Sequence, residues 1–167
     1  MRRRRSQMLS NLQLLKVKID QCEHQYNRIL LLVGKFGSGK TKLLQTISKS
    51  YNYPYINLNL TLSERLLNLN NNERSLLDLN DIMSDIVSSN ASEVIILDNI
   101  EIVFNPELKR DPLQLFRHIS RNKTIIVSWP GKYENQKLSY AEPYHPEYFE
   151  EKVTDLTIQN LSEQEGT

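Results

Sequence analysis

Leu30 to Thr41 reads LLLVGKFGSGKT, an apolar run that leads directly into a glycine-rich segment. The last eight residues of this stretch fit the pattern G-x-x-x-x-G-K-[ST], which is the P-loop or Walker A motif. Arg28 to Val33 has the apolar pattern of a short strand covered on both faces of a sheet, and residues from Thr41 to Ser50 have the pattern of a helix. The motif therefore leaves a predicted strand and enters a predicted helix, the context that its chemistry requires.

Glycine is scarce in this chain and gathers in the motif. There are only five glycines, and Gly34, Gly37 and Gly39 lie within six positions. Glycine permits backbone conformations that let successive N–H groups turn inward around an anion. At the start of the following helix, Lys40 would reach the β- and γ-phosphates of ATP, and the Thr41 hydroxyl would ligate Mg²⁺. We therefore predict ATP and Mg²⁺ as ligands, the alternative being a turn that binds nothing. The remaining predicted phosphate-binding residues are Lys35, Phe36, Ser38 and Lys42.

The rest of the chain alternates strand patterns with helix patterns. The expected strands cover residues 28–33, 55–59, 93–97 and 124–129, with a fifth over 153–158; the expected helices cover residues 9–26, 41–50, 63–69, 73–89 and 111–122, the last with Asp111 as its cap. Asn70, Asn71 and Asn72 form a turn by composition. This alternation predicts a mostly parallel sheet with helices on both faces. The expected fold class is α/β, a three-layer P-loop NTPase with an AAA+-like core and no separate lid domain, because fewer than forty residues follow the fourth strand.

An acidic residue ends the third predicted strand. Asp98 occupies the place of the Walker B acid, which holds Mg²⁺ through water, so Thr41 and Asp98 are the predicted metal-binding pair. Many P-loop ATPases of the AAA+ type carry Glu next, but here Asn99 follows, and Asn cannot accept a proton as a base. Glu101 reaches the γ-phosphate only if the chain turns after Asp98, because an odd step along a strand changes face. We predict Lys40, Asp98 and Glu101 as catalytic residues; the alternative for Glu101 is an ordinary surface acid.

Several other residues are candidates for a functional role. Ser128, near the end of the fourth strand, occupies a position where such ATPases sense the γ-phosphate. Arg117 and Arg121 lie on or just after the preceding helix, and they are either arginine fingers for a neighbouring subunit of a homo-oligomer or a solvated face. The three histidines show no metal-ligand spacing. Residues 140–148 predict an extended aromatic loop, because prolines interrupt its tyrosines, and it is either a partner-binding surface or a strap across the domain.

The near-neutral charge hides an uneven distribution. The net charge is +1, with 21 Lys and Arg against 20 Asp and Glu, yet Arg2 to Arg5 open the chain. No apolar stretch follows this run, so we expect no export signal, and no apolar run is long enough to span a bilayer. One cysteine excludes a disulfide framework, and the expected location is cytoplasmic. The expected organisation is a basic disordered arm over residues 1–8, which touches nucleic-acid phosphates or stays solvated, a P-loop nucleotide-binding domain over 9–160 and a frayed tail over 161–167.

Six segments besides the P-loop carry a resemblance to a known family. They are PYINLNLTLSERLL (54–67), IILDNIEIVF (95–104), DPL (111–113), SRNKT (120–124), SWPG (128–131) and residues 140–148. Over roughly residues 9–149, the chain resembles the BrxF family, small P-loop ATP-binding proteins of bacteriophage-exclusion (BREX) phage-defence systems. The Asp-Asn-Ile-Glu and Trp-Pro-Gly segments carry more of the resemblance than Walker A does, and Asp-Asn belongs to the family's pattern. The Arg2–Arg5 run and the tail after Phe149 lie outside it.

The resemblance implies a cytoplasmic ATP-binding protein of bacteria or archaea that works with other BREX-type defence proteins, which recognise, methylate or block phage DNA. DNA contact is then direct or through those partners. The predicted function is an ATP–Mg²⁺-dependent switch or slow ATPase within such a system. Two alternatives stay open. One is a small-molecule kinase of P-loop fold, which needs a mobile arginine-bearing lid, and the other is a non-catalytic interaction module stabilised by nucleotide.

Overall fold

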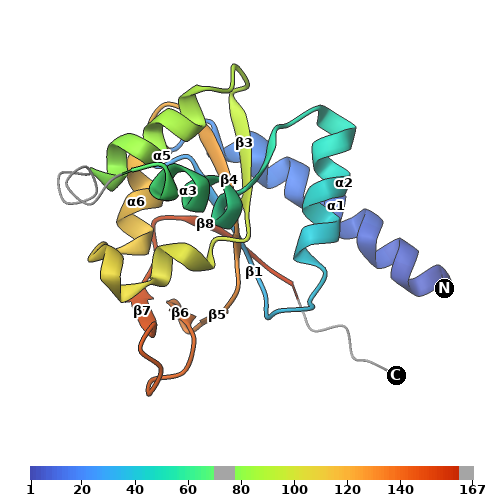
Figure 1. Cartoon of the computed structure of the whole chain (residues 1–167). Helices are drawn as coiled ribbons and strands as arrows, with labels where there is room; N and C mark the ends of the chain where they lie inside the picture. The colour runs from blue at the N-terminus through green and yellow to red at the C-terminus, as the bar shows by residue number, and fades with distance from the viewer. Residues whose placement is uncertain (70–77, 162–167) are drawn as a thin grey trace.

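A five-stranded parallel sheet forms the centre of the fold (Figure 1). The computed structural model describes residues 1–69 and 78–161; the expected Asn70–Asn72 turn, the start of the helix expected over 73–89 and nearly all of the expected tail lie outside them. The strands are β1 (Ile29–Val33), β2 (Tyr55–Asn57), β3 (Val94–Asp98), β4 (Thr124–Trp129) and β8 (Thr157–Asn160), in the order β2-β3-β4-β1-β8. All neighbouring pairs are parallel, as predicted.

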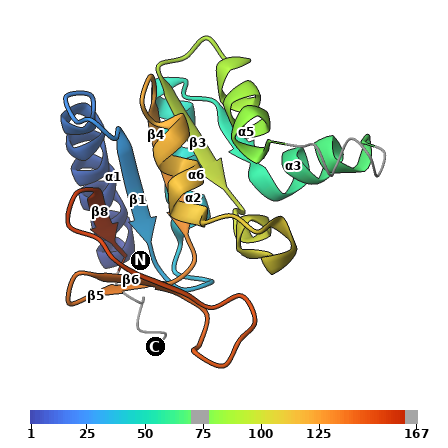
Figure 2. The ribbon, with the colours of Figure 1, turned by 90° about the vertical axis from the view of Figure 1, so that its left-hand side faces the viewer.

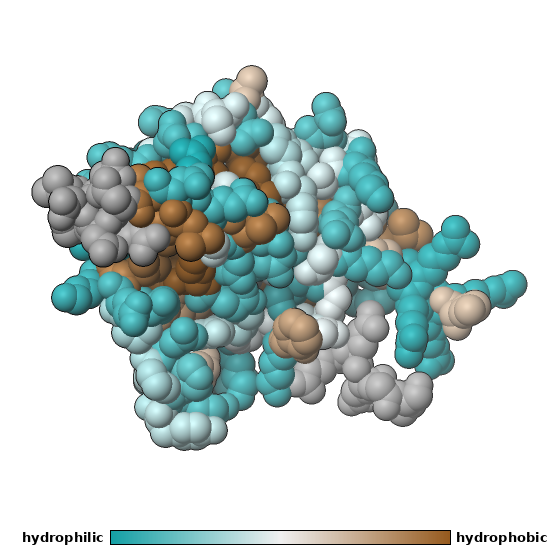
Figure 3. Space-filling view, in the orientation of Figure 1, coloured by the Kyte–Doolittle hydropathy of each residue, from teal (hydrophilic) through white to brown (hydrophobic). Residues whose placement is uncertain are grey.

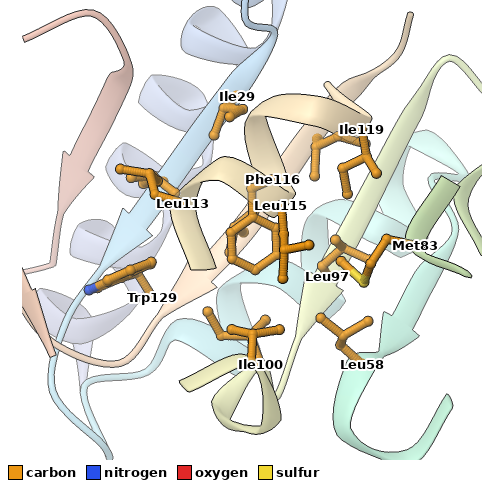
Figure 4. Packing of buried hydrophobic residues seen from close by; sticks show 14 of the residues in the cluster. Ile29, Leu58, Met83, Leu97, Ile100, Leu113, Leu115, Phe116, Ile119 and Trp129 are labelled. Atoms are coloured by element: carbon orange, nitrogen blue, oxygen red, sulfur yellow. The ribbon is translucent and has the colours of Figure 1, made fainter. Parts of the chain in front are cut away.

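Helices cover both faces of this sheet (Figure 1). One face packs against α1 (Arg2–Cys22) and α2 (Lys40–Tyr51), through alternate strand residues such as Leu30 and Leu32. The other face packs against α3 (Leu58–Leu67), α5 (Leu79–Ser88) and α6 (Pro112–Ile119), through Leu31 and Leu97 among others. Figure 4 shows side chains of α6 against this second face, with Phe116 among them. Because successive strand residues point to opposite faces, the apolar strands supply two cores, and the three-layer α/β class is confirmed.

The first helix is longer at its start than the apolar pattern predicted. It begins at Arg2, so residues 2–8 are helical, and the expected disordered arm is wrong for them. Arginine, glutamine and methionine favour helix, but they leave no apolar periodicity to reveal it. The helix ends at Cys22, whose buried thiol donates to the carbonyl of Ile29 at 3.5 Å, as expected for a packed cysteine. None of the described helices is long and apolar enough to cross a membrane.

Two boundaries differ around β2 and α3. The strand expected over 55–59 ends at Asn57, and α3 starts at Leu58, five residues before the expected helix over 63–69. The side chain of Asn57 accepts the N–H of Leu60 at 3.1 Å, which is an N-cap that starts the helix directly. At α6 the predicted cap is confirmed, because Asp111 accepts the N–H of Leu113 and of Gln114. That helix ends at Ile119 rather than near residue 122.

A second, antiparallel sheet joins β4 to β8. It consists of β5 (Lys132–Glu134), β6 (Lys137–Tyr140) and β7 (Phe149–Lys152), and it lies below the main sheet in Figure 2. Parallel strands are usually joined through a helix, so this connection departs from the expected alternation. The fifth strand, expected over 153–158, lies at 157–160. The strands of the second sheet are only three or four residues long and are rich in charged residues, too short for their alternation to predict a strand.

Aromatic side chains attach the second sheet to the main one. The ring of Tyr140 stacks on Phe104 with centroids 3.8 Å apart, and Trp129 meets Phe104 edge-on at 5.1 Å. Phe149 packs edge-on to Trp129 at 5.5 Å. The expected aromatic loop is therefore anchored at both ends, while Tyr144 at its centre is exposed. This cluster places the second sheet next to the residues that follow β3.

Replacement of Gly131 by alanine tests how tightly the two sheets are joined. A Cβ there would lie 1.9 Å from the carbonyl oxygen of Ser139, which also accepts the Trp129 Nε1–H at 3.0 Å. Because backbone must move to admit the methyl group, we expect G131A to lower the free energy of unfolding by about 3 kcal/mol. Urea denaturation measures this, with the exposed neighbour Lys132→Ala as control. Equal stability of both variants and wild type would contradict the packing described.

Candidate functional site

A hollow of about 400 Å³ opens beside the glycine-rich loop, at the carboxyl edge of the main sheet. Open parallel sheets bind ligands at this edge. The hollow brings together the loop with the first turn of α2, the end of β3 with the residues after it, and the end of β4. Its lining consists of Phe36, Gly37, Gly39, Lys40, Thr41, Lys42, Gln45, Asp98, Asn99, Glu101, Ser128 and Pro130. Nine of the predicted site residues, which come from separate segments of the chain, thus line one hollow.

The loop backbone has the conformation that an anion-binding loop needs. Gly37 and Gly39 have φ values of +81° and +95°, in the left-handed region that favours glycine. Gly39 is the N-cap of α2 and supplies no side-chain cap, so the first N–H groups of α2 keep their capacity to bind an anion. The remaining predicted loop residues, Gly34, Lys35 and Ser38, do not line the hollow, and they act on Lys40 instead.

The side chain of Lys40 is turned into the loop. Its Nζ donates to the carbonyl oxygens of Gly34 at 2.5 Å and Lys35 at 2.9 Å, and its contact with Ser38 Oγ is longer, at 3.4 Å. Burial lowers the pKa of Lys40, and the negative charges of Asp98 and Glu101 offset part of this effect. These neutral oxygens accept hydrogen bonds from the ammonium but do not neutralise its charge, so the position suits the terminal phosphates of a nucleotide, which would accept charge-assisted hydrogen bonds from it.

Asp98 is held as a carboxylate. The Thr41 hydroxyl donates to Oδ2 at 2.7 Å, and the N–H of Asn99 donates to Oδ1 at 2.9 Å. Burial raises the pKa of Asp98, but hydrogen bonds from Tyr55, Thr41, Asn99 and Ser128 together outweigh burial and leave it below its ordinary value. Thr41 and Asp98 therefore present neighbouring hydroxyl and carboxylate oxygens, the donor type that Mg²⁺ prefers. Ser128, predicted as a γ-phosphate sensor, also contacts this carboxylate.

Tyr55 is a site residue that sequence reasoning missed. It lies on β2, where it pairs with Ile96, two residues before Asp98, and its hydroxyl donates to Asp98 Oδ2. Burial and the hydrogen bond to Asp98 raise the pKa of Tyr55, so it remains a donor at neutral pH. The alternation of residues 55–59 predicts a strand. Nothing in the sequence indicated that this strand lies beside β3.

Removal of the Tyr55 hydroxyl should cost stability in a pH-dependent way. Because a hydrogen bond to an ionised group is stronger than a neutral one, we expect Tyr55→Phe to lower the free energy of unfolding by about 1–2 kcal/mol at pH 7. The pKa of Asp98 is depressed in the folded protein, so this stabilisation is present above the ordinary value of 3.8 and is lost as the pH falls through the folded value. Urea denaturation at pH 7 and below pH 4 measures the difference. A deficit that stays constant with pH would contradict the interaction.

The chain turns immediately after Asp98, which brings Glu101 into the hollow. Asn99 has a φ of +51°, and Glu101 begins the 3₁₀ helix η1 (Glu101–Phe104). The Nδ2 of Asn59, on α3, donates to Glu101 Oε2 at 2.9 Å, while Oδ1 of the same Asn59 accepts the N–H of Ile102 at 2.8 Å. Asn59 therefore holds both the carboxylate and the helix that carries it. Sequence reasoning also missed Asn59.

The arginines of α6 lie elsewhere. Arg117 donates to Glu151 at 3.0 Å and to Asp155 at 3.2 Å, so it ties α6 to the segment around β7 and is not a solvated side chain. The N–H of Arg28 donates to the carbonyl of Ser120 at 3.1 Å, which places the end of α6 at the amino edge of β1. Arg121 therefore lies at the edge of the sheet opposite the hollow of its own chain.

Comparison with known proteins agrees with this geometry. A sequence model of the "ATPase family associated with various cellular activities (AAA)" matches residues 30–126. The match includes the P-loop, Asp98 and Glu101, and it extends into β4. Curated protein sequences gave no significant match. Because the matched segment is more than half of the 167 residues, the chain belongs to the ATPase family associated with various cellular activities, whose members bind nucleotide, typically with Mg²⁺.

Proposed function

We propose that this protein is an ATP–Mg²⁺-dependent switch with slow ATPase activity, in which Glu101 is the general base. The observation that carries the proposal is the hydrogen bond between Asn59 and Glu101. Glu101 lines the same hollow as Lys40, Thr41 and Asp98, yet its carboxylate is engaged by a neighbouring helix. A carboxylate that accepts a hydrogen bond from Asn59 is held in place and is less free to turn toward an attacking water, which favours slow turnover.

The residues would divide the chemistry as follows. Lys40 would neutralise the terminal phosphates, and the loop N–H groups would hold them. Mg²⁺, held by Thr41 directly and by Asp98 through water, would supply positive charge to the β- and γ-phosphates. Glu101 would accept a proton from a water whose oxygen attacks the γ-phosphorus, while the bond from that phosphorus to the bridging oxygen breaks and ADP leaves. Displacement of Asn59 from Glu101 would free the base, so nucleotide state and the position of α3 would be coupled.

The region after η1 disfavours the kinase alternative. The 3₁₀ helix η2 (Pro106–Leu108) and the Asp111-capped start of α6 follow each other closely, and the Asn105 side chain caps η2 through the N–H of Glu107. Described residues 78–161 therefore offer no long loose segment here to act as a mobile lid. Phosphate release from ATP without any acceptor would support the ATPase; release only with an acceptor would support a kinase; and nucleotide binding without release would leave the non-catalytic module.

The setting that we propose is a BREX-type phage-defence system in the cytoplasm, with other BREX-type proteins as partners and DNA contacted directly or through them. Support comes from the segments that resemble the BrxF family, because three of them carry contacts described above. PYINLNLTLSERLL contains Tyr55 and Asn59, the Asp-Asn-Ile-Glu segment makes the turn to Glu101, and Trp-Pro-Gly joins the two sheets.

Affinity purification from the native host tests this setting. With ATP present, wild type should recover DNA-methylating or helicase-like defence components, whereas a Lys40→Ala variant should recover less of them. Omission of ATP from the wild-type sample should have the same effect as the substitution. Purification of the protein alone under all conditions would contradict the defence assignment without affecting the ATPase proposal.

A further inference from the structure

A second hollow, of about 500 Å³, continues the site past the start of α2. It shares Gly39 and Lys42 with the first hollow, and it contains neither Asp98 nor Glu101. Its other walls are the N-terminal half of α1, Ser38 of the loop, Leu43, and Leu161 just after β8. The two hollows therefore meet at the turn that would hold the phosphates, and a ligand longer than a triphosphate would extend from one into the other.

One face of α1 lines this second hollow. Met1, Arg4, Met8 and Asn11 follow a spacing of three or four residues, and Arg5 flanks them. The same face continues into Leu15 and Ile19, which are buried, whereas Arg4 and Arg5 are exposed. In Figure 1 this half of α1 projects past the body of the protein beside α2, and Figure 3 shows hydrophilic side chains around it. Arg2 and Arg3 do not belong to the lining.

The charge of this end of α1 is uncompensated. The first acidic residue of the sequence is Asp20, and within the described ranges Arg4 and Arg5 make no ion pair. The helix has no acidic residue in its first turn, and cations at a helix N-terminus oppose the helix dipole. An anionic ligand in the adjoining hollow would relieve this repulsion.

The chemistry of the second hollow suits the nucleoside end of ATP. If the terminal phosphates bind at Lys40 and Asp98 in the first hollow, the α-phosphate, ribose and base would extend past Gly39 and Lys42 into the second hollow. Met8, Leu43 and Leu161 offer apolar surface for a base, and the guanidinium plane of an arginine stacks on aromatic rings while its N–H groups bind phosphate. We propose that Arg4 and Arg5 bind the nucleoside and α-phosphate end of ATP, so that half of the arginine run belongs to the nucleotide site and not to a nucleic-acid arm. The inference rests on the proposed function.

The arginine run contains its own matched control. We expect Arg4→Ala/Arg5→Ala to raise the Kd for ATP about tenfold, because a stacked or phosphate-bound arginine is lost. Arg2→Ala/Arg3→Ala removes the same charge from the same turn and should change that Kd less than twofold. Inorganic tripolyphosphate keeps a phosphate in the α position but lacks the nucleoside, so its Kd should rise less than the Kd for ATP does in Arg4→Ala/Arg5→Ala and should change less than twofold in Arg2→Ala/Arg3→Ala. Isothermal titration at fixed salt measures the affinities, and thermal unfolding checks that both variants keep the stability of wild type, as alanine's high helix propensity predicts.

Two outcomes would overturn the assignment while leaving the proposed function intact. Equal losses of ATP affinity in the two double variants would indicate general electrostatic attraction, and unchanged ATP affinity in Arg4→Ala/Arg5→Ala would place the nucleoside elsewhere. Equal loss of binding to a DNA duplex in both variants, with ATP affinity unchanged, would support the nucleic-acid arm instead. If wild type bound neither ATP nor tripolyphosphate, the proposed function itself would fail.

Discussion

Replacement of Lys40 by alanine is expected to raise the Kd for ATP–Mg²⁺ about 100-fold. Removing one partner from a buried, hydrogen-bonded charge contact costs roughly 2–5 kcal/mol, and about 1.4 kcal/mol corresponds to a tenfold change. Lys40 is only 7% exposed and is the cation that the loop carbonyls of Gly34 and Lys35 hold in place. Titration with a fluorescent ATP analogue in Mg²⁺ measures the loss.

Lys49 provides the control for this experiment. It also lies on α2, in the last turn, and it does not line the hollow. Lys49→Ala should bind ATP with the affinity of wild type, which separates the specific contact from the loss of one positive charge. An affinity for ATP that survives Lys40→Ala would show that the glycine-rich loop is not the phosphate site, and the central assignment would then be wrong.

Replacement of Glu101 by glutamine is expected to lower ATP turnover about 100-fold while changing the Kd for ATP less than threefold. A positioned general base contributes roughly 10²- to 10⁴-fold to rate, and glutamine cannot accept the proton. The glutamine side-chain oxygen can still accept the hydrogen bond that Asn59 donates to Oε2, so the turn after β3 should be preserved. Single-turnover phosphate release and a parallel binding titration separate the two effects.

Glu107 provides a matched control for the Glu101 substitution. It lies in η2, is exposed and does not line the hollow, so Glu107→Gln should leave turnover unchanged. If Glu101→Gln released phosphate at the wild-type rate, Glu101 would not be the base. The hydrogen bond to Asn59 would then have only a structural role.

Two contacts connect Glu101 and its 3₁₀ helix to other parts of the molecule. Its 3₁₀ helix ends at Phe104, which stacks on Tyr140 of the second sheet, and its side chain is held by Asn59 of α3. A change in either neighbour would alter the position of the Glu101 carboxylate. The second sheet takes the place of the helix that usually joins parallel strands. The contact between Phe104 and Tyr140 therefore depends on this unusual connection.

Local patterns predicted much of the fold and the first half of the site. The apolar strands, the glycine spacing and the cap at Asp111 all act within a few residues, and the structure agrees with each of them. The patterns were weakest where polar residues form regular structure. The helix over Arg2–Arg5 has no apolar stripe, and the charged strands of the second sheet are too short for their alternation to be recognised, so both were missed.

The sequence alone determined the glycine-rich Walker A loop, the acidic residue Asp98 at the end of β3 and the three-layer α/β class, because these depend on residue type and short-range order. Tertiary structure decided which side chains complete the site. Tyr55 reaches Asp98 only because β2 lies beside β3, Asn59 reaches Glu101 only because the chain turns at Asn99, and Arg4 and Arg5 face the loop only because α1 packs along α2. Such contacts join residues far apart in the chain, and no local pattern contains the information on strand order and helix direction that sets them.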